Sequence, residues 1–203
     1  MSVSNQESLS SRRCEWCGSD PLYVSYHDHE WGVPEWDSRA LWEKLILDGF
    51  QAGLAWITIL RKRENFRAAF KGFDPHLIAE WGDDEVSQLL SDPGIIRHRG
   101  KIEATIGNAR AWQEIEAETG FDEFLWRYVD GIPLQNRFLT MADIPGESRL
   151  SQQISKDLKR AGFKFCGPTI VYAFMQAVGM VNDHIVACPR HAAVADLAGP
   201  RAR

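Results

Sequence analysis

The amino-acid sequence predicts an all-α protein built from many short helices. Apolar residues recur at helical spacing, as Leu41, Leu45 and Ile46 do, whereas the alternation typical of strands is scarce. Residues that favour helix starts stand ahead of these runs, and Pro-Gly pairs at 93–94 and 145–146 separate them. We therefore expect helices joined by tight turns rather than a sheet.

Start signals and periodicity place the helices in order. Asp37 or Ser38 caps the first, Asp74 precedes a proline suited to a first turn, and the acids at 83–85 suit another N-terminus. Apolar periodicity predicts the later helices, over about 101–118, 148–160, 168–178 and 183–195.

Length and composition indicate one folded domain. The chain has 203 residues, 44% hydrophobic and 25% charged, an ordinary balance for a globular protein. We expect tails at 1–12 and 198–203 around a single domain over 13–197, which has room for two helical lobes.

The sequence lacks the marks of secreted and membrane proteins. Its first thirteen residues have no apolar core, and the most apolar stretch, 169–181, is too short to span a bilayer. Four cysteines are too few for a disulfide scaffold. We expect a cytoplasmic monomer with no membrane partner.

The formal charge of −5 argues against a nonspecific nucleic-acid coat protein, but the charges are segregated. Bases gather at 61–71, 97–101 and 156–164, and acids gather at 80–92 and 114–130. A molecule with one basic face and one acidic face would account for both the net negative charge and the separate clusters of bases and acids. Solvated helix faces with no partner are the alternative, and the sequence leaves it open.

Cysteine and histidine residues near both ends have the spacing of metal ligands. Cys14 and His27 lie near one end, and His184 and Cys188, near the other, would lie one turn apart on a helix. Two thiolates and two imidazoles form a closed tetrahedral set that favours zinc and leaves no position for water. Such a metal would be structural and would pin the chain ends together.

Other side chains nearby are rival ligands. Cys17 forms C-x-x-C with Cys14, and His29 and His191 adjoin the other candidates. Packed or exposed side chains without a metal explain the same spacing, so the ligands stay undecided at this point. Cys166, ahead of an apolar helix, is expected to be buried and inert.

Four long blocks carry a resemblance to a known family. They are DPLYVSYHDHEWGVP at 20–34, LDGFQAGLAWITIL at 47–60, GIIRHRGKIEATIGNAR at 94–110 and GFKFCGPTIVYAFMQAVGMVNDH at 162–184. Collinear from about residue 13 to residue 188, they resemble the 3-methyladenine DNA glycosylase I family.

The resemblance implies a helix-hairpin-helix glycosylase fold. It also implies hydrolysis of the N-glycosidic bond of alkylated adenine in double-stranded DNA, without a redox or nucleotide cofactor. One structural zinc ion (Zn²⁺) per chain would be held by Cys14, His27, His184 and Cys188, with Cys17, His29 and His191 outside the set.

Aromatic residues are concentrated in the N-terminal part of the chain, namely Trp16, Tyr23, Tyr26, Trp31 and Trp56. Aromatic faces stack on a flipped base and attract a cationic one more strongly, and adenine alkylated at N3 is cationic. Aromatic residues at helical spacing are more often core. The resemblance implies that these positions line a base pocket, Tyr26 and Trp56 above all.

Asp48 stands in LDGFQAG where the resembled family typically has a glutamate. Its carboxylate could accept a hydrogen bond from the exocyclic amine of the base and stabilise positive charge, from a side chain one methylene shorter. We expect Asp48 to set specificity and to act as an electrostatic catalyst, with water as nucleophile. Without the resemblance, Asp48 reads as an exposed helix-end acid.

Nothing marks Lys101 or Lys164 as a Schiff-base former, so no strand cleavage is expected.

The segment GFKFCG at 162–167 is the expected hairpin for the DNA backbone. Gly162 and Gly167 would let backbone N–H groups approach a phosphate, and Lys164 would attract it. A plain helix–helix turn is the alternative.

Gln51, Gly53 and Leu54 follow Asp48 and could fill the gap that a flipped base leaves. The run RHRGK at 97–101 fits either a second backbone contact or a solvated loop.

Two other functions remain open. A zinc-stabilised protein could bind DNA lesions without releasing the base, which the aspartate at position 48 makes plausible. An unrelated zinc hydrolase would use histidines around an open metal, but the sequence has no H-E-x-x-H or G-x-S-x-G motif.

Overall fold

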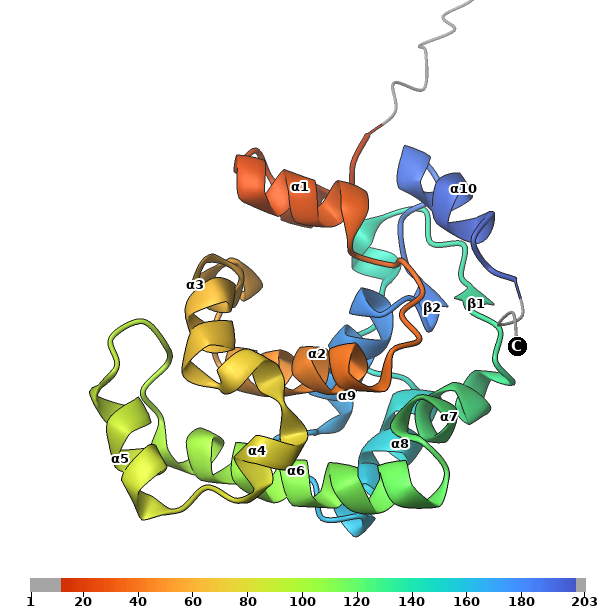
Figure 1. The fold of residues 1–203 in the computed structure, drawn as a ribbon. Helices are drawn as coiled ribbons and strands as arrows, with labels where there is room; N and C mark the ends of the chain where they lie inside the picture. The colour runs from red at the N-terminus through yellow and green to blue at the C-terminus, as the bar shows by residue number, and fades with distance from the viewer. Residues whose placement is uncertain (1–11, 200–203) are drawn as a thin grey trace, which may run out of the picture.

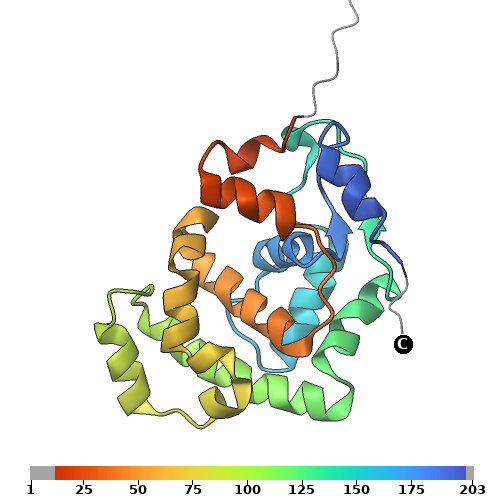
Figure 2. The same ribbon diagram turned by 45° about the horizontal axis from the view of Figure 1, so that its top comes forward.

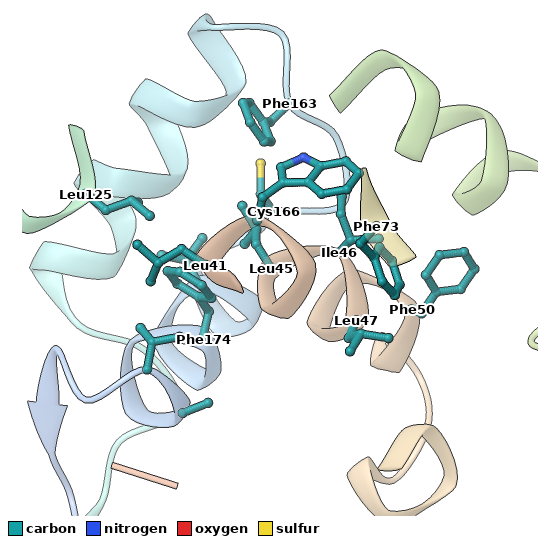
Figure 3. Packing of buried hydrophobic residues seen from close by; sticks show 14 of the residues in the cluster. Leu41, Leu45, Ile46, Leu47, Phe50, Phe73, Leu125, Phe163, Cys166 and Phe174 are labelled. Atoms are coloured by element: carbon teal, nitrogen blue, oxygen red, sulfur yellow. The ribbon is translucent and has the colours of Figure 1, made fainter. Parts of the chain in front are cut away.

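Asp37 begins the central helix of the fold, α2 (Ser38–Gln51), as the sequence predicts. In this computed structural model, which describes residues 12–199, its carboxylate accepts a 2.8 Å hydrogen bond from the amide of Ala40. Most of the helix after its first turns is buried, with side chains such as Leu41, Leu45 and Phe50 packed in the core (Figure 3). Helix α2 contacts α3, α6, α7 and α9, so it fixes the position of whatever its side chains present.

The described chain is mostly helical, which confirms the fold class in its main feature (Figure 1). The α-helices are α1 (Pro21–His29), α2, α3 (Trp56–Ala69), α4 (Pro75–Ala79), α5 (Asp83–Ser91), α6 (Arg99–Glu118), α7 (Phe121–Trp126), α8 (Arg149–Arg160), α9 (Pro168–Ala177) and α10 (Pro189–Ala195). Short 3-10 turns lie at η1 (Glu15–Cys17), η2 (Lys71–Phe73), η3 (Arg127–Val129) and η4 (Met141–Asp143). Two residues each of β1 (Leu134–Gln135) and β2 (Val181–Asn182) pair in parallel.

Helix caps explain several of these boundaries. Asp74 accepts a 2.9 Å hydrogen bond from the amide of His76 ahead of α4, and Ser148 caps α8 through the amide of Ser151 at 3.0 Å. Asp20 does the same for α1, with Pro21 in its first turn. These side chains satisfy amides that the first turn of a helix leaves unpaired.

The structure corrects the expected helices in two respects. Helices α1, α3 and α7 were not predicted, because their charged or aromatic sequences show no clear apolar stripe. The last helix is α10 and not 183–195: residues 183–188 form an irregular turn, and Pro189 occupies the first turn of the helix. His184 and Cys188 therefore do not share a helix face.

The two ends of the described chain lie side by side. Helix α1 and helix α10 occupy the same end of the molecule in both views (Figures 1 and 2), and α6 runs along the opposite side. A continuous cluster of buried apolar side chains connects α1, α2 and α6. Residues 1–11 and 200–203, which hold most of the two predicted tails, lie outside the described residues. Among the described helices, none is long and apolar enough to cross a membrane.

Candidate active site

A cavity of about 380 Å³ lies between η1, α1, α2, the start of α3, η4 and α9. This volume is within the range of small-ligand sites. All five aromatic side chains singled out from the sequence border it. The complete lining is Trp16, Tyr23, Tyr26, Trp31, Lys44, Asp48, Gln51, Trp56, Met141, Ile144, Pro145, Gly146, Thr169, Tyr172, Ala173, Gln176 and Ala177.

The aromatic side chains form one connected group. The ring centroid of Trp16 lies 5.0 Å from those of Tyr23 and Trp31, and the rings of Tyr26 and Trp56 are 5.5 Å apart. Tyr26, Trp31 and Trp56 are buried while bordering the cavity. Such mutually packed rings give a planar ligand a firm apolar wall.

Asp48 is buried in the cavity wall, so the structure excludes an exposed helix-end acid. Its Oδ1 accepts a 2.6 Å hydrogen bond from Nζ of Lys44, one turn earlier on α2, and the Nζ lies 3.7 Å from the ring centroid of Trp56. Burial raises the pKa of Asp48, and Lys44 opposes that shift. Burial also lowers the pKa of Lys44. The short contact indicates an ion pair inside the cavity wall.

Three polar atoms of residues that line the cavity are buried without a hydrogen-bond partner in the described structure. They are Oδ2 of Asp48 and the indole Nε1 of Trp16 and of Trp56. Buried polar atoms are normally paired, so these atoms need a ligand or water. Oδ2 of Asp48 can accept a hydrogen bond from an amino group, and each indole N–H can donate one to a ring nitrogen. The cavity can therefore stack a planar base and accept a hydrogen bond from its amine.

The turn between α2 and α3 holds Leu54 out to solvent. Leu54 is 41% exposed and follows Gly53, whose φ of +82° favours glycine.

The ammonium of Lys101 donates hydrogen bonds to the carbonyls of Phe50 at 2.9 Å and Ala52 at 2.8 Å. Lys101 thus holds the end of α2, a role that neither interpretation of the run 97–101 included.

The segment 161–167 joins α8 to α9 in a tight hairpin. Gly162 has φ +100°, and Phe163 turns into the core while Phe165 stays exposed. The side chain of Asn108 holds the backbone of Lys164 on both sides, accepting from its amide at 2.8 Å and donating to its carbonyl at 3.1 Å. The hairpin is therefore held in a defined shape, with the Lys164 side chain exposed.

The basic runs differ in their surroundings. In the run 61–71, Arg61 pairs with Asp20 at 2.6 Å and Arg67 with Glu43 at 2.7 Å, while Lys62 donates to the carbonyl of Pro93. These cations are engaged within the protein. In the run 156–164, Arg160 pairs with Asp157 at 3.0 Å, while Lys156, Lys159 and Lys164 are exposed next to the hairpin.

Cys14, His27, His184 and Cys188 converge into one buried cluster that could hold a metal ion. The Sγ atoms of Cys14 and Cys188 lie 3.6 and 3.7 Å from Nδ1 of His184, and Nε2 of His27 lies 3.6 Å from Sγ of Cys188. Ligands of a tetrahedral metal with bonds of about 2.0–2.3 Å are separated by roughly 3.5 Å. The four side chains fit such a site, although the two C-terminal ones reach it from a turn.

The remaining ring nitrogens are held as metal-bound histidines require. His27 Nδ1 lies 2.8 Å from a carboxylate oxygen of Asp28, and His184 Nε2 lies 3.0 Å from the carbonyl of Trp31. Such outer partners orient imidazole ligands. Since Trp31 borders the cavity, the cluster also braces the aromatic wall.

The rival ligands point elsewhere. The Cys17 thiol donates to the carbonyl of Cys14, and His29 and His191 contact the carbonyls of Ser25 and Asn136. Cys166 is buried, as predicted, and burial raises its pKa to about 11.

Sequence reasoning missed three parts of the cavity wall. Lys44 stands four residues before Asp48, a spacing that could have suggested the ion pair. Tyr172 and Gln176, also four apart, both donate to the buried carboxylate of Asp183 and form the α9 wall. The segment 141–146 carries no pattern that could have placed it there.

Comparisons with known proteins agree with one another. A family model described as methyladenine glycosylase matches residues 16–191. The DNA-3-methyladenine glycosylase 1 of Escherichia coli strain K12 is 52% identical over 177 residues, which cover 87% of this chain and 95% of that protein.

Two solved structures have the same fold. A crystal structure of 3-methyladenine DNA glycosylase I superposes with a TM-score of 0.86 at 53% identity and covers 88% of this chain and 98% of its own. The second structure is a tyrosine-to-phenylalanine variant of a 3-methyladenine DNA glycosylase I in complex with 3-methyladenine. It superposes with a TM-score of 0.85 at 39% identity, and the match covers 87% of this chain and 95% of that chain.

Proposed function

The chain belongs to the methyladenine glycosylase family, and from that premise we propose that it excises 3-methyladenine from double-stranded DNA by hydrolysis. The cavity carries this proposal, because it combines an aromatic wall with a buried carboxylate that has one unpaired oxygen. A base inside a duplex cannot reach such a cavity, so the enzyme has to flip the nucleotide out of the stack.

Each cavity group has a role in this reaction. Tyr26 and Trp56, with Trp16, Tyr23 and Trp31 around them, stack on the flipped base, and Oδ2 of Asp48 accepts a hydrogen bond from its amine. An N3-alkylated adenine is cationic and leaves as a neutral base, so binding and electrostatic stabilisation by Asp48 supply much of the rate. Water is the nucleophile.

The hairpin 161–167 and the turn after α2 serve the DNA. Backbone amides around Gly162 and Gly167, with Lys164, bind phosphate at the start of α9, in the helix-hairpin-helix manner of the family. The exposed Leu54, with Gln51 and Gly53, fills the space that the flipped base leaves.

Within residues 12–199, no lysine near the cavity is placed to cleave the strand. Lys101 is bound to two carbonyls, and Lys44 is held by Asp48 as an ammonium, which is not a nucleophile. We therefore propose a monofunctional enzyme.

Zinc is the metal that the cluster of Cys14, His27, His184 and Cys188 suits. Two thiolates with two imidazoles favour zinc over magnesium or calcium, and four protein ligands leave no position for substrate. Zinc there is structural and joins the chain ends.

The test is base release from methylated duplex DNA by wild type and Asp48→Asn. The amide keeps the shape but removes the charge, so we expect 3-methyladenine release by wild type and a loss of about 100-fold in the variant, the scale of one electrostatic contact. Chromatography identifies the released bases, and gel electrophoresis of the strand reports nicking. Folding and zinc content of both proteins are the controls.

Other outcomes point elsewhere. Wild-type protein that binds methylated DNA but releases no base would indicate a lesion-binding protein without glycosylase activity. Strand nicking that accompanies release would contradict the monofunctional proposal.

A further inference from the structure

Lys44 brings a second positive charge to a cavity proposed for a cationic base. Its ammonium contacts Asp48 at 2.6 Å and lies over the ring of Trp56 at 3.7 Å. A carboxylate and an aromatic face are the two features that attract a cationic ligand. In this chain both are already in contact with a cation of the protein.

The surroundings of Lys44 keep its ammonium on Asp48. Glu30 pairs with Arg63 and Glu43 with Arg67. The carboxylate of Glu35 accepts hydrogen bonds from the amides of Trp36 and Asp37, so these neighbouring carboxylates all have other partners. The contact with Asp48 joins two side chains on one face of α2, where the i, i+4 spacing favours it. Lys44 and Asp48 therefore form a neutral pair, and Oδ2 of Asp48 keeps its capacity to accept a hydrogen bond.

We propose that Lys44 is a specificity-determining residue that reduces the preference of this cavity for cationic over uncharged 6-aminopurine bases. A cationic base is attracted by the Asp48 carboxylate but also meets the repulsion of the Lys44 ammonium, which offsets part of that attraction. An uncharged base avoids that repulsion and still donates its amino hydrogen to Oδ2 of Asp48. The inference rests on the proposed function, because it assumes that this cavity receives the base.

The class of bases that the cavity binds is therefore wider than N3-alkylated adenine. Purines that carry the 6-amino group but no positive charge should enter the cavity with comparable affinity. Lys44 does not touch the reacting bond, and its effect is on which base is bound.

The test measures binding of two free bases of the same shape by calorimetry at mildly alkaline pH. The permanently cationic probe is 3,9-dimethyladeninium, and the uncharged probe is 3,9-dimethyl-3-deazaadenine. We expect wild type to bind the two within about tenfold of each other. We expect Lys44→Met to raise the ratio of cationic to uncharged affinity by about tenfold or more, the scale of one cation–π or ion contact.

Controls separate charge from structure. Lys156→Met makes the same change on the exposed face of α8 and should leave the ratio at its wild-type value. Lys44→Arg keeps the positive charge and should give the wild-type ratio of cationic to uncharged affinity. Lys44→Gln serves if the methionine variant does not fold, because glutamine can still donate to Asp48.

Each result decides a different question. An unchanged ratio in the methionine and glutamine variants, or a wild type that prefers the cation by a hundredfold, would overturn the role of Lys44. A folded wild type that binds neither probe would instead contradict the cavity as the base site, and with it the proposed function.

Discussion

Gly49 sets how closely the hairpin 161–167 approaches the helix that carries Asp48. A Cβ atom at this position would lie 3.3 Å from the carbonyl oxygen of Phe165 and 3.4 Å from its Cβ. The first contact is with backbone, which cannot turn away as a flexible side chain can. The absence of a side chain at one position therefore couples the base cavity to the proposed DNA-binding hairpin.

We expect Gly49→Ala to displace the hairpin and weaken duplex DNA binding several-fold. Gly107→Ala is the matched control, since Gly107 lies in the middle of α6 with open space around its Cβ position. That change should stabilise the protein by about 0.5–1 kcal/mol, because alanine is the better helix residue. Fluorescence anisotropy with labelled duplex and thermal unfolding report the two effects. Equal DNA affinity in both variants would contradict the coupling.

At the scale of elements, α2 is central because it is buried on several sides and fixed at both ends. Asp37 caps its N-terminus, and Lys101 of α6 holds the carbonyls of Phe50 and Ala52 at its C-terminus. Both ends are thus anchored by side chains, which restrains Asp48 one turn before the end. The proposed base contact depends on this restraint, since small displacements in an active site are costly.

Removing the Lys101 ammonium should loosen the end of α2. Lys101→Met leaves two carbonyls without their charged donor, at a cost of about 2–3 kcal/mol in the free energy of unfolding. We expect faster amide hydrogen exchange around residues 50–54 and a lower urea midpoint, whereas Lys156→Met should change neither. Wild-type exchange rates in this segment would show that other contacts hold the helix end.

Capped and periodic helices could be predicted from the sequence, and convergence in space could not. Asp37 and Asp74 mark α2 and α4 because a capping side chain acts within three residues. Residue types and the resemblance predicted the four candidate metal ligands. The expected helix over 183–195 was wrong, however, because His184 and Cys188 approach His27 from the turn before α10. Lys44 was missed because a buried ion pair and a surface pair have the same spacing along a helix.

At the scale of the whole molecule, the cluster of Cys14, His27, His184 and Cys188 joins segments about 170 residues apart in sequence. Cys14 and His27 come from the first described elements, and His184 and Cys188 from the turn before α10. The same cluster touches the cavity through Trp31, whose carbonyl contacts His184 and whose ring lies 4.6 Å from that of His184. A metal there would therefore stabilise the chain ends and the aromatic wall together.

We expect a chelator that removes the proposed zinc ion to lower the melting temperature and to make the thiols of Cys14 and Cys188 reactive. Metal binding to the folded state adds directly to its stability. Base release should fall in parallel with the folded fraction and return on adding zinc. Cys166, buried with its pKa raised to about 11, should stay unreactive until the protein unfolds and is the internal control. Loss of activity while circular dichroism and Cys166 protection are unchanged would instead indicate a catalytic metal, as in an unrelated zinc hydrolase.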